Sequence, residues 1–202
     1  MSAFLKLTYH IDALSRRVGC IAIYLVLFSS LVSAFNALAR YSTGAFYWLD
    51  AQLGTAVFGR LVNFYGANSN ALLEAQWYMF AGIVMLGGPW TLKLNEHVRV
   101  DLVYGGMVGE RTRTWIDLAG GIVFLLPMCL LMLYFTLPWF WQSYVTGEQS
   151  VNAGGLVRWP VKIMVPFGFA LMALQSVSEI VKCVLALRTS YVREFAYEKP
   201  LQ

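Results

Sequence analysis

The chain carries no charged side chain between Ala75 and Leu92, and directly after this run it becomes densely charged, from Lys93 to Asp101. With Ala71 to Leu73 just before Glu74, the run supplies about the 20 residues that a helix needs to cross ~30 Å of hydrocarbon. The charged segment cannot follow such a helix into lipid, because ionised groups are costly there. This junction therefore predicts the point at which the chain leaves a membrane.

Three further apolar runs of similar length predict the same kind of element. The four predicted spans are residues 18–39, 71–94, 115–141 and 161–187. Composition agrees, since 58% of the 202 residues are hydrophobic and only 13% are charged, about half the usual charged share of a soluble domain. We expect an all-α integral membrane protein with four transmembrane helices in a single membrane domain.

The first span has an alternative interpretation. Arg16 and Arg17 precede it, and Ala37-Leu38-Ala39 has the form of a signal-peptide cleavage site. However, the run is longer than the ~7–15 residues of a usual signal-peptide core, and other spans follow it. We therefore predict a retained helix.

The connection between the first two spans mixes aromatic and polar side chains. Leu49, Leu53, Ala56, Arg60 and Phe64 recur near one helical face. Such a pattern is typical of helices that lie at a membrane surface, so we expect an interfacial amphipathic helix at residues 46–64. Residues 66–70 are rich in turn formers and predict a break before the second span.

The distribution of basic residues predicts the orientation. One side of the predicted membrane receives eleven of the 15 Lys and Arg residues, and the other side receives only Arg40, Arg60, Arg158 and Lys162. The positive-inside rule then places both termini and the 96–114 loop in the cytoplasm. Because the basic residues lie at the ends of apolar runs, we expect no nucleic-acid partner.

Side chains that could carry catalysis or hold a cofactor are scarce. The two histidines, His10 and His97, lie outside the apolar runs, whereas a haem or metal site in a bundle needs ligands facing each other from different spans. The three cysteines lack metal or disulfide spacing, and we expect them to be buried thiols. The sequence therefore predicts no enzyme activity, no cofactor and no metal.

A chain that transports a solute alone would place ionisable groups near the membrane midplane. The candidates here, Glu74, Lys162, Glu179 and Lys182, all lie toward the ends of predicted spans. The four spans also show no clear internal duplication. We therefore expect a membrane subunit that packs against a larger partner.

Four sequence blocks, at positions predicted independently to be span ends, resemble a known family. They are EAQWYMFAG from Glu74, LKLNEHVRVDLVYGG from Leu92, WIDLAGGIVFLLP from Trp115 and GEQSVNAGGLVRWPVKIMVPFGFALMALQ from Gly147. In this order they resemble the small four-helix membrane subunit, the DctQ-like component, of tripartite ATP-independent periplasmic (TRAP) transporters. The likeness covers about Glu74 to Lys182 and is looser in the first span.

The resemblance implies a secondary uptake system in the bacterial cytoplasmic (inner) membrane. In such systems a periplasmic substrate-binding protein delivers a solute, commonly an organic acid, to a two-part membrane unit. The large subunit carries the substrate and ion sites and moves, whereas the small subunit braces it among the membrane lipids and adds to the docking surface. The alternative is a four-span adaptor or assembly protein unrelated to transport.

The resemblance also implies roles for two groups of residues. The expected large-subunit interface is Glu96, His97, Arg99, Asp101, Glu74 and Gln76, with a solvated charge cluster as the alternative for the first four. The expected periplasmic docking face is Glu148, Ser150, Arg158 and Trp159, with capping of the span ends as the alternative.

Overall fold

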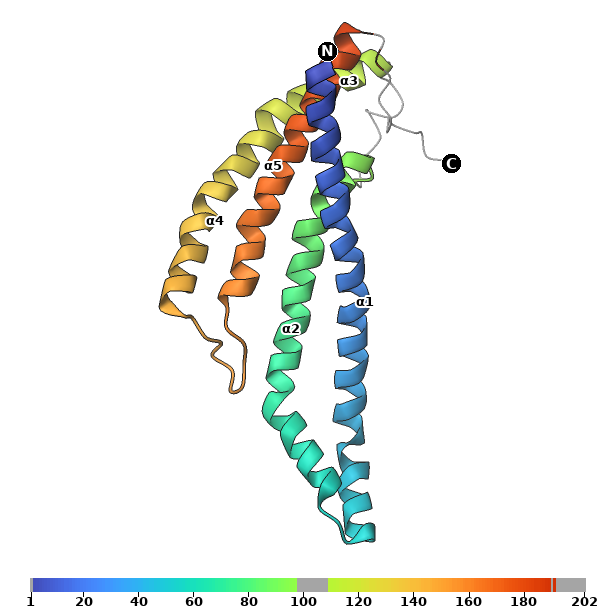
Figure 1. Cartoon of the computed structure of the whole chain (residues 1–202), viewed down its shortest axis with the longest axis vertical. Helices are drawn as coiled ribbons and strands as arrows, with labels where there is room; N and C mark the ends of the chain where they lie inside the picture. Colours follow the sequence, from blue (N-terminus) through green and yellow to red (C-terminus); the bar gives the residue numbers. More distant parts are fainter. Residues whose placement is uncertain (1, 98–108, 190, 192–202) are drawn as a thin grey trace.

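Long helices make up most of the computed structural model, which describes residues 2–97, 109–189 and 191 (Figure 1). The elements are α1 (Ser2–Leu53), α2 (Val57–Leu94), α3 (Glu110–Gly120), the π-helical turn η1 (Gly121–Leu125), α4 (Leu126–Thr146) and α5 (Trp159–Arg188). Because α3, η1 and α4 follow one another without a break, they form one long helix. In the described residues, four helices are thus long and apolar enough to cross a membrane, which confirms the predicted all-α membrane fold.

The connection between the first two spans is a helical hairpin and not a separate surface helix. α1 continues to Leu53, residues 54–56 turn the chain, and α2 begins at Val57. The interfacial helix predicted at residues 46–64 is therefore absent as one element, since the turn lies in its middle. The break predicted at residues 66–70 is also wrong, because these residues lie inside α2.

Asp50 provides the physical reason for this difference. Its carboxylate accepts hydrogen bonds from the backbone N–H groups of Phe58 (3.1 Å) and Gly59 and from the hydroxyl of Thr55 (2.8 Å). The two N–H groups belong to the first turn of α2, where no helical carbonyl is available to them. A residue that looks like a polar interruption in the sequence thus caps the next helix. Gly54 makes the turn itself, with φ of +60°.

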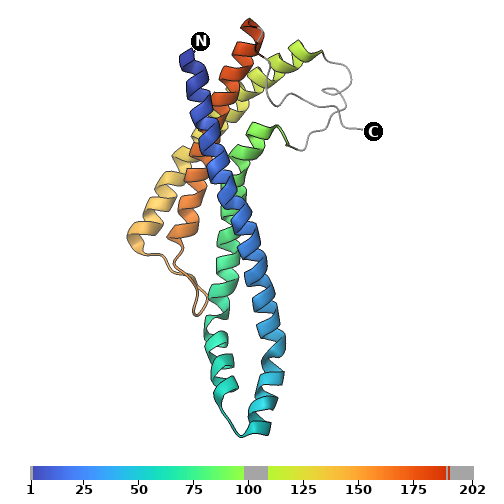
Figure 2. The same cartoon turned by 45° about the vertical axis from the view of Figure 1, so that its right-hand side comes forward.

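The helices pack as two antiparallel pairs (Figures 1 and 2). α1 runs beside α2, and α5 contacts α4, α2 and α1. The buried apolar cluster between α1, α2 and α5 consists of Val18, Ala22, Leu86 and Leu171. Most large apolar side chains on α1 and α4 are exposed in the isolated chain, as expected for surfaces that contact lipid or another subunit.

Glycines set the close approach of the helices. A Cβ atom on Gly19 of α1 would lie 2.4 Å from the Trp90 ring of α2, and one on Gly168 of α5 would lie 2.6 Å from the Cβ of Met85. Small residues at such crossings allow backbones to come near each other and increase dispersion contacts, which drive helix association in lipid. These two positions therefore fix how α2 sits between its neighbours.

Candidate functional site

A buried carboxylate on α2 fastens the loop between α4 and α5, residues 147–158, to the bundle. Glu74 is only 7% exposed. It accepts hydrogen bonds from the Ser150 hydroxyl, from the side-chain amide of Asn152 (2.9 Å) and from the backbone N–H of Leu156 (2.6 Å). Hydrogen bonds to an ionised group are stronger than neutral ones, so Glu74 is the main attachment point. We call this end of the bundle the loop end.

Two neighbours of Glu74 on the same face of α2 support the loop on either side. Asn70 donates to the backbone carbonyl of Ala153 (2.9 Å), and the Tyr78 hydroxyl donates to that of Val157 (3.1 Å). Asn70, Glu74 and Tyr78 are each four residues apart, the spacing that aligns side chains on one helical face. This polar spacing was a signal in the sequence from which the attachment could have been predicted.

The loop is a narrow hairpin that only glycine allows at its inner turn. The backbone N–H of Ser150 donates to the carbonyl of Leu156 (3.1 Å), and that of Arg158 donates to the carbonyl of Glu148 (2.9 Å). A Cβ atom on Gly155 would lie 2.5 Å from the Cβ of Ser150 and 2.9 Å from the Glu74 carboxylate. Any larger residue at this position therefore pushes the loop away from its attachment.

Glu148 closes the base of the hairpin through its charge. The carboxylate contacts the Lys162 ammonium group and lies 3.5 Å from the Arg158 guanidinium. Lys162 also lies 4.5 Å from the ring centroid of Trp139, a favourable cation–π distance. The hydrogen bond from Lys162, together with the positive charge of Arg158, lowers the pKa of Glu148 below its usual value of 4.5.

At the opposite end of the bundle, a second buried polar cluster joins α1 to α5. Its members, which we call the Asp12 network, are Asp12, Ser15, Gln175, Ser178, Glu179 and Lys182. The Lys182 ammonium group pairs with Asp12 (2.8 Å) and with Glu179 (2.7 Å). The Gln175 amide donates to both carboxylates, at 3.0 Å each, and accepts from Ser15 (2.6 Å), while Ser178 donates to Asp12 (2.8 Å).

The Asp12 network is a structural clamp between α1 and α5. Gln175 and Ser178 are completely buried, and a buried charge is tolerated only when other groups pair with it. The α5 members recur at intervals of three and four residues, so they form one polar stripe on an otherwise apolar helix. That stripe was visible in the sequence, but nothing there identified Asp12 as its partner. Within α5, Lys182 donates to Glu179, three residues earlier, at 2.7 Å.

The charged junction at the end of α2 begins with a left-handed residue. Asn95 has φ of +60°, its N–H donates to the carbonyl of Leu92 (3.2 Å), and the N–H of Glu96 donates to that of Thr91 (3.3 Å). This pair of bonds is the Schellman arrangement, in which asparagine is one of the few residues that replace glycine. Glu96 and the following histidine therefore leave the helix in a defined direction. The predicted interface residues Arg99 and Asp101 lie outside the described residues.

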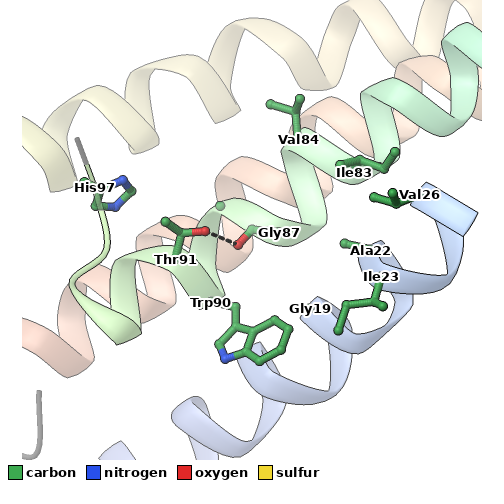
Figure 3. Close-up of a pocket in the computed structure, with 11 residues that line it drawn as sticks. Gly19, Ala22, Ile23, Val26, Ile83, Val84, Gly87, Trp90, Thr91 and His97 are labelled. Carbon is green, nitrogen blue, oxygen red and sulfur yellow. Dashed lines mark hydrogen bonds between the residues drawn. The ribbon is translucent and has the colours of Figure 1, made fainter.

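His97 lies at one end of a shallow groove between α1 and α2, of about 400 Å³ (Figure 3). The walls are small or apolar, with Gly19 and Ala22 on α1 and Gly87 on α2. The hydroxyl of Thr91 in this wall donates back to the carbonyl of Gly87 (3.2 Å). Among the described residues that line the groove, His97 is the titratable one.

The structure brings together the residues predicted for the docking face, but it uses several of them internally. Glu148 pairs with Arg158, Ser150 binds Glu74, and Trp159 packs edge-on against the Tyr144 ring at 5.6 Å. Each of these contacts stabilises the loop end.

The structure also places the other predicted residues. Glu74, predicted at the surface for a larger partner, is buried beneath the loop, and Gln76 is half-buried on α2. The cysteine prediction is correct for Cys129 and Cys183, which are buried, and wrong for Cys20, which is exposed.

The chain was also compared with known proteins. Residues 51–186 match the family model described as tripartite ATP-independent periplasmic transporters, DctQ component. The chain belongs to this DctQ family. The match includes the Glu74 attachment, the whole loop hairpin and the α5 members of the Asp12 network, and it begins after Asp12 and Ser15. No curated protein and no solved structure matches the chain.

Membership in the DctQ family defines the general role of the chain. It is the small membrane subunit of a TRAP transporter, and with its four apolar helices it is a multi-pass membrane protein. The DctQ family is a transporter component and not an enzyme family. The family match therefore disfavours the alternative of an adaptor unrelated to transport.

Proposed function

We propose that this DctQ component braces the large transport subunit of a secondary uptake system for organic acids or related solutes. It lies in the bacterial cytoplasmic membrane, with both termini and the 96–114 loop in the cytoplasm. Its loop end faces the periplasm, where it adds to the surface on which a substrate-binding protein docks. The Asp12 network then lies at the cytoplasmic end of the bundle.

The observation that carries the bracing role is the pairing of the buried charges within the chain. Lys182 pairs with both Asp12 and Glu179, and Glu74 accepts from three donors of the loop. A solute pathway needs polar groups that exchange their partners for the solute, whereas these groups hold helices and loop together at both ends. Fully satisfied polar networks rigidify a fold, which supports a static brace beside a moving partner.

The docking role is supported by the attachment of the loop hairpin. Its inner side is held by Glu74, Asn70 and Tyr78. Its outer side therefore already has a fixed conformation before a partner binds. Val151 at the tip is 87% exposed. Preorganised surfaces bind with a smaller entropic penalty. In this proposal Glu74 acts by positioning the loop, and Glu148, Ser150, Arg158 and Trp159 shape the surface that meets the binding protein.

The interface with the large subunit is proposed at the junction after α2 and on the exposed face beside it. Its charged part consists of Glu96, His97, Arg99 and Asp101. Gln76, nearer the loop end of α2, belongs to the other end of this interface. Replacing Arg99 or Asp101 with alanine is expected to weaken co-purification with the large subunit. Intact assembly in both variants would instead assign these residues to a solvated cluster.

Deletion of the gene that encodes the chain tests the proposed function. We expect uptake to be lost without the chain and restored by its re-expression, and we expect the tagged chain to co-purify with a larger, many-span partner. No single side-chain change in this subunit is expected to alter which solute is transported. A variant with normal assembly and a switched solute preference would contradict the bracing role.

Fusion reporters test the orientation separately. After Asn95, a reporter that works only in the cytoplasm is expected to be active. After Gly147, a reporter that works only in the periplasm is expected to be active, because the basic residues concentrate on one side. The opposite pattern would reverse the proposed topology while leaving the bracing role standing.

A further inference from the structure

The groove between α1 and α2 lies in the part of the chain that is suited to span the membrane. Apart from His97, its lining residues fall within residues 19–26 of α1 and 83–91 of α2, and both helices are long and apolar enough to cross a bilayer. Its walls are open to the outside, since Ile23 and Val84 are 56% and 61% exposed. Because the hydrocarbon region holds no water, the groove is filled either by a lipid chain or by apolar groups of another protein.

The width of the groove suits a lipid chain. Its volume is about 400 Å³, and residues 83–91 of α2 rise about 12 Å along the helix axis. The mean cross-section is therefore about 33 Å², which corresponds to a width of about 6 Å. A helix with its side chains is about 10–12 Å across, so it does not fit into the groove as a whole. An extended hydrocarbon chain carries no side chains and is narrower.

The groove is apolar along its length and becomes polar at one end. A Cβ atom on Gly87 would meet the Cβ of Ala22 at 3.7 Å, an ordinary contact, so small residues leave the middle of the groove open. The Thr91 hydroxyl donates to the carbonyl of Gly87 (3.2 Å) and thus has its partner within α2. Figure 3 shows His97 beyond Thr91, where α2 has ended. An acyl chain with a polar headgroup has the same sequence of properties.

α1 carries a basic residue at this polar end. Arg16 precedes Gly19 by three residues and Ile23 by seven, spacings that place the three positions along one helical face. Gly19 is level with Trp90 near the end of α2, because its Cβ atom would lie 2.4 Å from the indole ring. The two helices are antiparallel, so Arg16 lies one turn further toward the end of α2. Arg16 is also exposed.

The charges at this end favour an anionic ligand. Asp12, about one turn before Arg16 on α1, is paired with Lys182 of α5. Glu96 follows α2 but does not line the groove. Arg16 therefore provides positive charge at the mouth of the groove. Basic residues beside grooves between membrane helices bind the headgroups of anionic lipids, and the cytoplasmic leaflet is rich in such lipids.

We propose that the groove binds one anionic phospholipid of the leaflet at the end of the bundle opposite the loop end. One acyl chain lies between Ala22 and Gly87, and the Arg16 guanidinium holds the headgroup phosphate through its paired N–H donors. The lipid joins α1 to α2 near the level at which the Asp12 network joins α1 to α5. The proposal rests on the proposed function only in naming this leaflet as the cytoplasmic one.

Photo-crosslinking tests the site in the complex with the large subunit, reconstituted in phosphatidylcholine bilayers. The probe is phosphatidylglycerol with a diazirine in one acyl chain, added as a minor component. Phosphatidylcholine with the same diazirine chain is the headgroup control. Mass spectrometry of the peptides measures labelling of residues 19–26 and 83–91, and the exposed apolar residues at 122–131 on η1 and α4 are the reference for ordinary bilayer contact.

Arg16→Gln and Arg17→Gln form the matched pair of variants. Both arginines are exposed, but Arg17 lies about 100° further around α1, away from the groove. In the unaltered chain we expect phosphatidylglycerol to label the groove about fivefold more than phosphatidylcholine, the factor typical of one basic residue at an anionic headgroup. Arg16→Gln is expected to abolish this preference, and Arg17→Gln is expected to keep it.

A second pair of variants tests the position of the acyl chain. Gly87→Leu fills the groove and is expected to lower its labelling by both lipids. Gly66→Leu, at an open position of the same helix, is the control and is expected to leave the labelling unchanged. Co-purification with the large subunit verifies that each variant assembles, and the comparison of the two lipids on the unaltered chain needs no variant.

Three outcomes would overturn the proposal. Equal labelling of the groove by the two lipids, or a preference that persists in Arg16→Gln, would show ordinary bilayer contact. A groove that stays unlabelled while residues 122–131 are labelled would show that another protein covers it. The fusion reporters are independent of this result, because a reversed orientation would assign the site to the other leaflet without removing it.

Discussion

The carboxylate of Asp12 lies 2.8 Å from the ammonium group of Lys182, so the beginning of the first helix is bound to the end of the last one. Both side chains are largely buried, at 14% and 12% exposed. The pair closes the bundle at the end opposite the loop hairpin. Its removal is the most direct way to test the clamp.

Replacing Lys182 with methionine is expected to destabilise the subunit. The change leaves the Asp12 and Glu179 carboxylates near each other without their cation, and breaking a buried pair by removing one partner typically costs about 3–5 kcal/mol. Thermal unfolding of the purified complex measures this effect. Lys6→Met, which removes the same charge from an exposed position on α1, is the control. Equal unfolding temperatures of the two variants would show that this ion pair does not stabilise the bundle.

Replacing Glu74 with alanine is expected to release the loop hairpin. The Ser150 hydroxyl, the Asn152 amide and the Leu156 N–H lose their acceptor, which weakens loop attachment by about 2 kcal/mol. A protease added to the detergent-solubilised complex is expected to cut residues 148–158 faster, by about 30-fold, because cleavage follows the population of the released loop. Glu110→Ala, at an exposed position of α3, serves as the control. Unchanged cleavage would show that other contacts hold the loop.

The base of the hairpin is expected to loosen only in acid. The pKa of Glu148 is lowered in the folded protein, chiefly by the hydrogen bond from Lys162. Its stabilising contribution is therefore complete above the unfolded value near 4.5 and is lost as the pH falls through the lower folded value. Hydrogen exchange of residues 148–158, corrected for intrinsic rates, measures this. Glu148→Gln is expected to abolish the acid step, and loosening already near pH 6 would contradict this origin.

The left-handed residue at the end of α2 is expected to accept glycine but not valine. Asn95→Gly preserves the φ of +60°, whereas Asn95→Val forces a β-branched side chain into this conformation, at about 1–2 kcal/mol. Co-purification with the large subunit and the melting temperature are measured for both variants. Because Glu96 and His97 follow directly, the valine variant is expected to weaken assembly as well. Equal co-purification of the two variants would show that the junction after α2 is not part of the interface with the large subunit.

The long uncharged runs determined the membrane fold in advance, because a chain with few charges and repeated apolar stretches of about 20 residues has no other stable environment. The charge count likewise predicts an orientation. Family membership was also visible, since the blocks around Glu74 and after Gly147 keep their residues and order, and the match over residues 51–186 confirms it. These properties depend on local composition or on residues adjacent in the chain.

Tertiary structure alone decided which polar residues meet. Asp50 resembles an interruption in the sequence, yet it caps α2 because the chain turns back beside it. Glu74 resembles a surface carboxylate, yet the loop after α4 folds over it. Asp12 pairs with Lys182 only when α1 and α5 pack together. The polar positions on α2 and α5 leave a periodic trace in the sequence, but the partner of each does not, because only the packed bundle determines which segments come together.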